Sequence, residues 1–147
     1  MAGSGGRSPV AGSGGRSPVA GLRWLVSGAQ LLRRLWARRL ELYQVTLELI
    51  TSCRPFGPRL KRFNPRLGAQ LTEALASTLQ NLAEAMRRTG SDRAHLLSIS
   101  LGSCDEVRAL LEAALAFGVL SASEQQGAEA LADRVCAMTY RLRQRCM

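Results

Sequence analysis

Leucine and other apolar residues recur every three or four positions through most of this chain, from Leu22 to Leu142. This spacing gathers apolar side chains on one side of an α-helix, whereas a half-buried strand requires strict alternation. Glycine and proline lie mostly in the first 21 residues and in a few connectors. The sequence therefore predicts an all-α fold and disfavours β architectures.

The interruptions divide this part of the chain into four predicted helices, at about residues 22–52, 65–88, 92–117 and 122–145. Pro55 and Pro58 are expected to end the first helix, because proline disrupts a helix interior, and to leave a connector from Cys53 to Phe63. Asn64 followed by Pro65 is typical of a helix start, since asparagine accepts hydrogen bonds from free backbone N–H groups and proline suits the first helical position.

The later helix ends are predicted by other capping signals. Thr89-Gly90 closes the second helix, because glycine tolerates the left-handed conformation beyond a helix end, and Gly118 closes the third. Ser91-Asp92 is expected to cap and begin the third helix. Ser121, with Glu124 three residues later, forms a predicted capping box for the fourth.

Four amphipathic helices joined by short turns bury their apolar stripes against one another, so residues 22–146 are expected to form one antiparallel up-down four-helix bundle. Aromatic residues make up only 5% of the chain, which predicts a core of aliphatic and small side chains. Trp36 lies on the apolar side of the first helix and is assigned to the core. Trp24 precedes the well-patterned region and is a candidate interfacial residue.

The first 21 residues differ from the rest of the chain. Residues 2–10 (AGSGGRSPV) recur unchanged as residues 11–19, and they are rich in glycine, serine and proline without apolar periodicity. We interpret residues 1–21 as a disordered tail.

Positive charge is concentrated in the first half of the chain. Residues 1–66 hold 12 basic and 2 acidic side chains (+10), whereas residues 67–147 hold 8 and 9 (−1), which sums to the net charge of +9. Clustered arginine attracts phosphate polyanions. This predicts nucleic-acid binding by Arg33, Arg34, Arg38, Arg39, Arg59, Lys61 and Arg62. The alternative is a solvated helix face on which Glu41 and Glu48 pair with these arginines. Arg39 falls on the apolar side, where it snorkels to an edge or faces a partner or pore.

The sequence offers little for catalysis or for cofactor and metal binding. His95 is the only histidine and is expected at the surface, and no CxxC pair occurs among the four cysteines, which are expected to be reduced. Three of them are interpreted as apolar fillers, and Cys146 as exposed. We interpret Asn81, Glu84, Asp105 and Glu106 as interhelical polar contacts. Because no set of catalytic residues can be assembled, a non-enzymatic protein is predicted. We expect no transmembrane span or signal peptide, which predicts a cytoplasmic location.

Two segments carry a resemblance to a known family. Residues 76–85 (ASTLQNLAEA) resemble the SSIPANIAEG-type signature of the four-helix-bundle proteins of 23S rRNA intervening sequences, with matches at Ser77, Asn81, Ala83 and Glu84. Residues 97–106 (LSISLGSCDE) resemble its LSIALGSLNE-type segment, and residues 117–121 (FGVLS) its LGYLS turn. Trp36 stands where the family has its first-helix tryptophan. Leu79 departs from the pattern, since the family commonly has proline there.

The resemblance implies a homo-oligomer, often a homopentamer, and a related branch comprises retroelement accessory proteins that bind a reverse transcriptase and nucleic acid. By this analogy, Gly102 and Ser103 allow close helix approach. The first functional hypothesis is a homo-oligomeric bundle that binds RNA or DNA through basic residues of the first helix. The alternatives are a protein-interaction adaptor, such as a reverse transcriptase accessory subunit, or a purely structural bundle.

Overall fold

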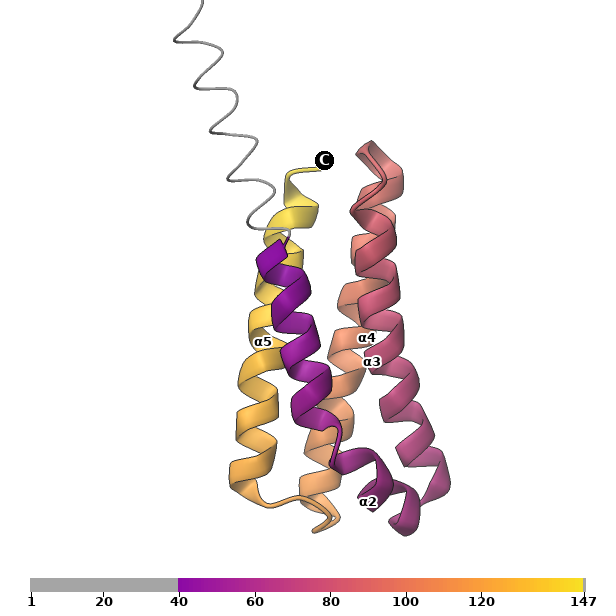
Figure 1. Cartoon of the computed structure of the whole chain (residues 1–147), viewed down its shortest axis with the longest axis vertical. Coiled ribbons are helices and arrows are strands. Elements are labelled where there is room, and N and C mark those ends of the chain that lie inside the picture. Colours follow the sequence, from indigo (N-terminus) through magenta and orange to yellow (C-terminus); the bar gives the residue numbers. More distant parts are fainter. Residues whose placement is uncertain (1–39, 147) are drawn as a thin grey trace, which may run out of the picture. The chain divides into compact units, whose positions relative to one another are not determined.

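The computed structural model describes residues 40–146, and all regular structure in this range is helical (Figure 1). A helix over residues 40–53 is followed by α2 (Phe56–Phe63), α3 (Pro65–Ala85), α4 (Gly90–Ala116) and α5 (Ala122–Gln144). No strand occurs between residues 40 and 146, so the all-α prediction is confirmed for this part of the chain. None of the described helices is long and apolar enough to cross a membrane.

Residues 1–39 and Met147 lie outside the described residues. The predictions of a disordered tail over residues 1–21, of a core position for Trp36 and of an interfacial position for Trp24 all concern this part of the chain. The same holds for the beginning of the predicted first helix, of which residues 40–53 are described.

The described helices share one aliphatic core. α3 packs against α4, α4 packs against α5, and the short α2 packs on α3 (Figure 1). The 40–53 helix lies beside α5, where Arg134 donates to Glu41 at 2.9 Å. Phe56 is the one aromatic side chain buried in residues 40–146, which confirms the predicted aliphatic core. The largest fully buried side chains of this core include Leu42, Leu49, Leu60, Leu71, Leu82, Leu97 and Leu111.

The 40–53 helix buries a wider stripe than the sequence indicated. Leu42 and Leu49 are buried as predicted. Val45 is buried as well, which widens the apolar stripe of this helix. Thr46 beside it is fully buried, and its hydroxyl donates to the carbonyl oxygen of Leu42 at 2.8 Å, so the polar atom is satisfied within the helix.

The predicted connector from Cys53 to Phe63 is wrong, because α2 occupies most of it. The 40–53 helix does end where the sequence indicated, just before Pro55. Pro58, however, lies in the first turn of α2, where a missing N–H leaves no hydrogen bond broken. Phe56 and Leu60, four residues apart, are both buried and anchor this short helix on the core.

Two helix starts were predicted with different success. Asn64 caps α3 as expected, with its side-chain oxygen accepting from the backbone N–H of Arg66 at 2.9 Å and with Pro65 at the first position. The cap predicted at Ser91 is wrong, because Thr89 is the N-cap and α4 already begins at Gly90, whereas Asp92 does lie in the first turn as expected. The predicted closure of the second helix at Thr89-Gly90 is also wrong, because α3 ends at Ala85. Gly90 has a φ of +56°, which glycine adopts without strain, and Arg93 bonds back to the carbonyl of Thr89.

The turn between α4 and α5 is specified on both sides. Gly118 has a φ of +69°, and its N–H donates to the carbonyl of Leu115 while that of Val119 donates to Ala114. This pair of bonds is the Schellman arrangement that ends a helix. Ser121 and Glu124 then form the predicted capping box of α5. Residues 117–121 are therefore a rigid connection rather than a loose loop.

The corner between α2 and α3 brings two backbones very close together at Gly68. A Cβ atom at this position would lie only 2.7 Å from the backbone nitrogen of Lys61. Gly68 is buried within α3, and no side chain fits there unless α2 moves. The position of Lys61 and its neighbours on α2 thus depends on this glycine.

Candidate nucleic-acid interface

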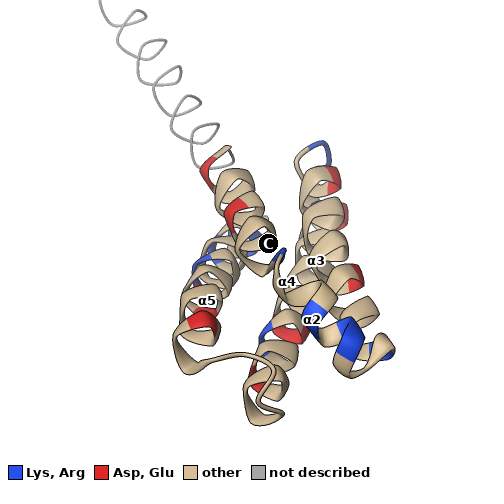
Figure 2. Cartoon of the chain, turned by 60° about the horizontal axis from the view of Figure 1, so that its bottom comes forward, with Lys and Arg blue, Asp and Glu red and all other residues tan. Residues whose placement is uncertain are grey.

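The segment from residue 54 to residue 66 is the most basic part of the described chain. It contains five basic side chains, and no acidic residue occurs between Glu48 and Glu73. α2 and its junction with α3 carry most of them, so they come together at one end of the helices (Figure 2). We name the four exposed members the basic corner: Arg54, Lys61, Arg62 and Arg66.

The side chains of the basic corner are available to a ligand. All four residues are exposed, and within residues 40–146 none of their charged groups forms an ion pair or a hydrogen bond. Free guanidinium and ammonium groups suit phosphate oxygens, to which they donate charge-assisted hydrogen bonds. Lys61 and Arg62, two of the predicted site residues, belong to this surface.

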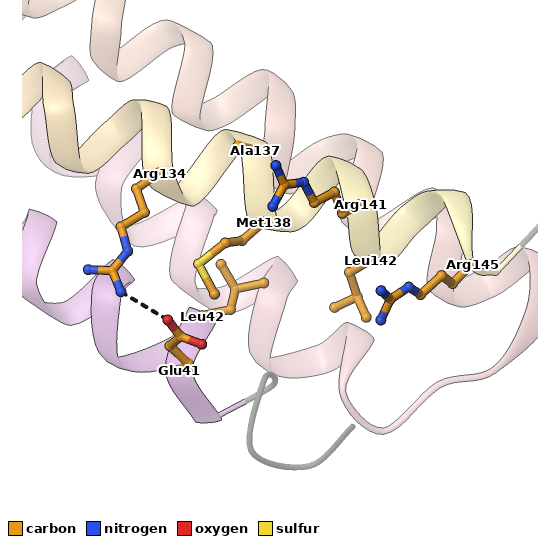
Figure 3. A pocket seen from close by; sticks show the side chains of 8 residues that line it. All are labelled: Glu41, Leu42, Arg134, Ala137, Met138, Arg141, Leu142 and Arg145. Atoms are coloured by element: carbon orange, nitrogen blue, oxygen red, sulfur yellow. Dashed lines mark hydrogen bonds and ion pairs between the residues drawn. The ribbon is translucent and has the colours of Figure 1, made fainter. Parts of the chain in front are cut away.

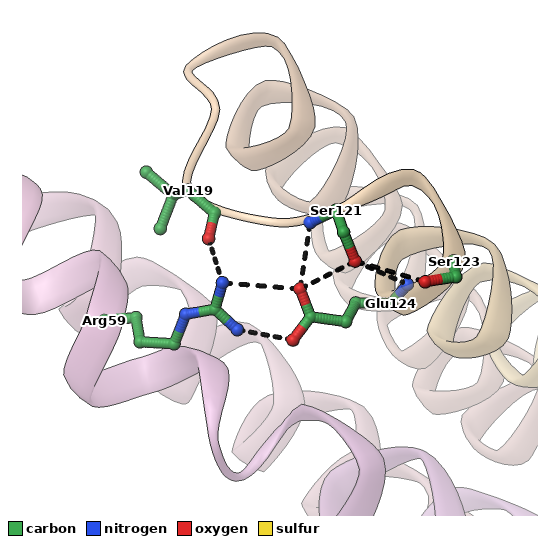
Figure 4. A network of polar contacts seen from close by, with 5 residues as sticks. All are labelled: Arg59, Val119, Ser121, Ser123 and Glu124. Atoms are coloured by element: carbon green, nitrogen blue, oxygen red, sulfur yellow. Dashed lines mark hydrogen bonds and ion pairs between the residues drawn. The ribbon is translucent and has the colours of Figure 1, made fainter.

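Arg59 is engaged differently from its neighbours on α2. Its Nη1 donates to Glu124 Oε1 at 2.5 Å, and its Nη2 donates to Glu124 Oε2 at 3.3 Å and to the carbonyl oxygen of Val119 (Figure 4). The guanidinium is therefore saturated on the side that would grip a phosphate. We assign Arg59 to a clamp between α2 and the α4–α5 turn. Its predicted contact with phosphate stays a prediction.

The clamp lowers the pKa of Glu124 to about 2, from its ordinary value of 4.5. The main cause is the hydrogen bond from Arg59, followed by the hydrogen bonds from the backbone and side chain of Ser121. Ser121 N–H donates to Glu124 Oε2 at 2.9 Å, so the same carboxylate serves the helix cap and the clamp. The negative charge of Glu124 is thus compensated locally beside the basic corner.

We expect acid to destabilise the protein through this carboxylate. The pKa of Glu124 is lower in the folded chain than in the unfolded chain. The contribution of the clamp to the free energy of unfolding is therefore fully present above about pH 4.5 and is lost as the pH falls towards about 2. The Glu124→Gln variant should therefore show a flatter dependence of stability on pH in this window. Urea unfolding midpoints between about pH 5 and about pH 2.5 measure it. The exposed Glu106→Gln variant is the control, and an equal flattening in both variants would contradict the assignment.

Four of the predicted contacts, Arg33, Arg34, Arg38 and Arg39, lie outside the described residues. Their role in binding stays a prediction, as does the question of which side of the first helix Arg39 faces. Glu41 and Glu48 were the acidic partners proposed for these arginines. Among the described residues, Glu41 pairs with Arg134 of α5.

Two exposed aromatic rings lie beside the basic corner, and neither was among the residues predicted from the sequence to bind nucleic acid. Phe63 ends α2 and Phe117 follows α4; their ring centroids are 5.2 Å apart with an interplanar angle of 34°. Phe63 is 53% exposed and Phe117 is 54% exposed. The sequence signals that could have indicated these two rings are local ones. Phe63 follows Arg62 directly, and Phe117 directly precedes the helix-ending Gly118.

A second group of basic residues lines a pocket of about 370 Å³ between α5 and the 40–53 helix (Figure 3). Arg134, Arg141 and Arg145 contribute to its wall together with Glu41. The ion pair between Arg134 and Glu41 neutralises one of these charges. This pocket is therefore less positive than the basic corner, and Met138 and the leucines at its base make it largely apolar.

The two segments that carry the family resemblance meet across α3 and α4. The Oγ atoms of Ser77 and Ser103 are 2.8 Å apart, and Ser100 donates to the carbonyl of Thr78 at 2.9 Å. Asn81 donates to the carbonyl and to the hydroxyl of Ser77, so it reaches α4 only through that serine. These small polar side chains link α3 to α4.

The interhelical contacts predicted for Glu84 and Glu106 are wrong, whereas Asp105 does contact a neighbouring helix. Glu84 pairs with Arg88 of its own helix at 2.8 Å, and Glu106 is exposed and makes no polar contact within residues 40–146. Asp105 pairs with Arg108 one turn away and reaches α5 only by accepting from the thiol of Cys136 at 3.8 Å. Arg108 also joins α4 to α5, since its Nε atom lies 3.0 Å from Asp133 Oδ1.

The close helix approach expected at Gly102 is also wrong within the chain. Gly102 is exposed, and a Cβ atom built there would meet nothing within 4 Å. Ser103, the adjacent residue, does face α3 through its bond to Ser77. A helix places neighbouring residues about 100° apart, so one of the pair faces the core and the other faces outward.

All four cysteines are free thiols. Cys53 is buried, and burial raises its pKa to about 11, which makes it unreactive. Cys104 is buried as predicted. Cys136 is only partly buried and contacts Asp105, so it is not a purely apolar filler. Cys146 was expected to be exposed, but it is partly buried and donates to the carbonyl of Leu142 at 3.3 Å.

The described residues give no support to a metal site. Within residues 40–146 no group of three or more His, Cys, Asp or Glu side chains is placed to hold a metal ion. His95 is exposed on α4, as predicted. Arg93, two residues earlier, is buried, which the sequence pattern did not indicate.

Comparison with known proteins extends the sequence resemblance. The family model of the 23S rRNA-intervening sequence protein matches residues 38–141, which includes almost all of the described helices. No curated protein matches the chain. The matched range contains the basic corner, the Arg59 clamp and both exposed phenylalanines.

Proposed function

Because the chain belongs to the 23S rRNA-intervening sequence protein family, we propose that it is a non-enzymatic cytoplasmic protein that binds nucleic acid through a basic surface. The contacts are Lys61 and Arg62, joined by Arg54 and Arg66 of the basic corner and by the predicted Arg33, Arg34, Arg38 and Arg39 of the first helix. The family name concerns an element of ribosomal RNA, which makes RNA the first ligand to test.

The main observation behind this proposal is that the four cationic side chains of the basic corner form no ion pair within residues 40–146. At least four of the nine other basic side chains of the described residues form ion pairs with carboxylates: Arg59 with Glu124, Arg88 with Glu84, Arg108 with Asp105 and Asp133, and Arg134 with Glu41. The basic corner has no such partner within residues 40–146, although like charges this close repel one another. A polyanionic ligand relieves this repulsion and releases its own counterions on binding.

We further propose that the chain forms an antiparallel up-down four-helix bundle and assembles with copies of itself, as a homopentamer by the family analogy. An apolar groove of about 890 Å³, lined by Ile50, Leu71, Leu75 and Leu79 among others, lies along α3 and the 40–53 helix. Leu40 is also 60% exposed. Arg54 and Lys61 also line this groove, so a second copy that covers its apolar part must leave these two cations accessible to nucleic acid. Light scattering at micromolar concentration is expected to give a multiple of 15.9 kDa, and a monomeric mass would contradict self-assembly.

A salt titration of RNA binding tests the function. If each of the four residues of the basic corner contacts one phosphate of a single strand, log K should fall against log salt with a slope of about −3, which is on the order of a 50-fold loss of affinity between about 50 and about 200 mM salt. Contacts by the arginines of the first helix would make the slope steeper. The affinity should vary little between sequences, because phosphate contacts carry no base information. Absence of binding at low salt would overturn the proposal and favour the alternative of a protein-interaction adaptor, for example a reverse transcriptase accessory subunit.

A further inference from the structure

Phe63 and Phe117 form an aromatic pair that the protein keeps outside its core. Each ring is more than half exposed, although every other large aromatic or aliphatic side chain of α2 is buried. The rings come from elements far apart in the sequence, the end of α2 and the turn after α4, and their centroids are 5.2 Å apart. Exposed apolar surface of this kind commonly marks a binding site.

The pair is held in a fixed place by the structure beneath it. Arg59, one turn before Phe63, grips both Glu124 and the carbonyl of Val119, which is two residues after Phe117 (Figure 4). The backbone on either side is also bonded, since Asn64 N–H donates to Leu60 and Phe117 N–H donates to Ala113. A ligand that contacts the two rings therefore finds them already in position, at little cost in conformational entropy.

The surroundings of the rings are positive. Lys61, Arg62 and Arg66 lie within three residues of Phe63, and all three are exposed. The clamp compensates the charge of Glu124, the acidic residue bound to α2 at this end. An apolar partner protein would gain nothing from these cations, whereas a strand of nucleic acid presents flat bases and regularly spaced phosphates together.

We propose that Phe63 and Phe117 form a stacking platform for the bases of single-stranded nucleic acid, with Lys61, Arg62 and Arg66 binding the adjoining phosphates. Bases in a duplex are stacked on one another and do not offer their faces, so the platform selects single strands. RNA and DNA share this chemistry, because a base has the same π-face in both. This inference rests on the proposed function and adds the strandedness of the ligand to it.

The test compares the full-length chain with its Phe63→Leu/Phe117→Leu double variant by fluorescence anisotropy. The probes are a single-stranded RNA, the DNA strand of the same sequence, their duplexes, and an abasic strand that keeps the phosphates. We expect the double variant to lose about ten-fold or more in affinity for the single strands, since stacking contributes about 1–3 kcal/mol per base. Binding to the duplexes and the abasic strand should stay within about two-fold. A loss with the RNA or with the DNA supports the platform and identifies the strand that it accepts.

Two further measurements keep the test decisive. The Phe63→Tyr/Phe117→Tyr variant preserves the ring faces and should bind single strands like the original chain. Circular dichroism and light scattering check that fold and mass are unchanged in both variants. Unchanged single-strand binding by the leucine variant, an equal loss with every probe, or a change of mass would overturn the platform while leaving the basic corner in place. If the original chain binds no probe at low salt, the proposed function itself has failed.

Discussion

Replacement of Lys61, Arg62 and Arg66 together by glutamine is expected to weaken RNA binding about 100-fold at about 0.1 M salt. Each phosphate contact contributes about 0.7 to the salt slope for a single strand, so the loss of three contacts should reduce the slope by about 2. The fold should be unaffected, because all three side chains are exposed and make no ion pair within residues 40–146. The salt titration of the variant measures both quantities.

A variant of equal charge serves as the control for this experiment. Arg87, Arg88 and Arg134 are also exposed, and Arg88 and Arg134 are paired with Glu84 and Glu41. Their replacement by glutamine removes three positive charges without touching the basic corner. We expect this control to keep most of the affinity. If both triple variants lose affinity equally, net charge drives the binding and the basic corner has no special role.

The Gly68→Ala variant is expected to lose about 1–3 kcal/mol of stability, the usual cost of overpacking a close contact. A Cβ atom at this position would lie 2.7 Å from the nitrogen of Lys61 and 2.9 Å from its Cα, and a backbone cannot yield as a flexible side chain does. The displacement would also move α2 and the cations that it carries. Urea unfolding at neutral pH measures the loss as a lower midpoint.

Gly102 provides the matched control, since it too lies inside a helix but has open space around the position of a Cβ atom. The Gly102→Ala variant should be more stable than the original chain by about 0.5–1 kcal/mol, because alanine restricts the unfolded chain and favours the helix. A loss of stability in this variant would contradict the exposed position of Gly102. Equal effects at both glycines would contradict the close approach at Gly68.

The sequence predicted helix starts correctly where the capping contact joins residues only two or three positions apart. The caps of α3 and α5 involve residues two or three positions apart, Asn64 with Arg66 and Ser121 with Glu124. Such contacts form inside one turn and need no other part of the chain. The cap predicted at Ser91 was wrong, because Thr89 is the N-cap of α4 and the helix begins one residue earlier, at Gly90.

The candidate site was only partly accessible to sequence reasoning. Lys61 and Arg62 were identified because positive charge accumulates visibly along the chain. Arg59, three residues before Arg62, has the same chemistry and the same local context, yet it is committed to Glu124, which lies 65 residues away. No spacing within α2 distinguishes these arginines, because their difference depends on a partner that only folding brings near.

The sequence by itself determined that the chain is helical, which residues begin and end most of its helices, and that its core is aliphatic. The periodicity and capping that specify these features act over a single helical turn. Only the tertiary structure decided that α2 folds within the apparent connector, that Gly68 brings its backbone against α3, and that Phe63 meets Phe117. These features join residues that are distant in sequence or depend on how one helix sits on another, and packing in three dimensions alone selects them.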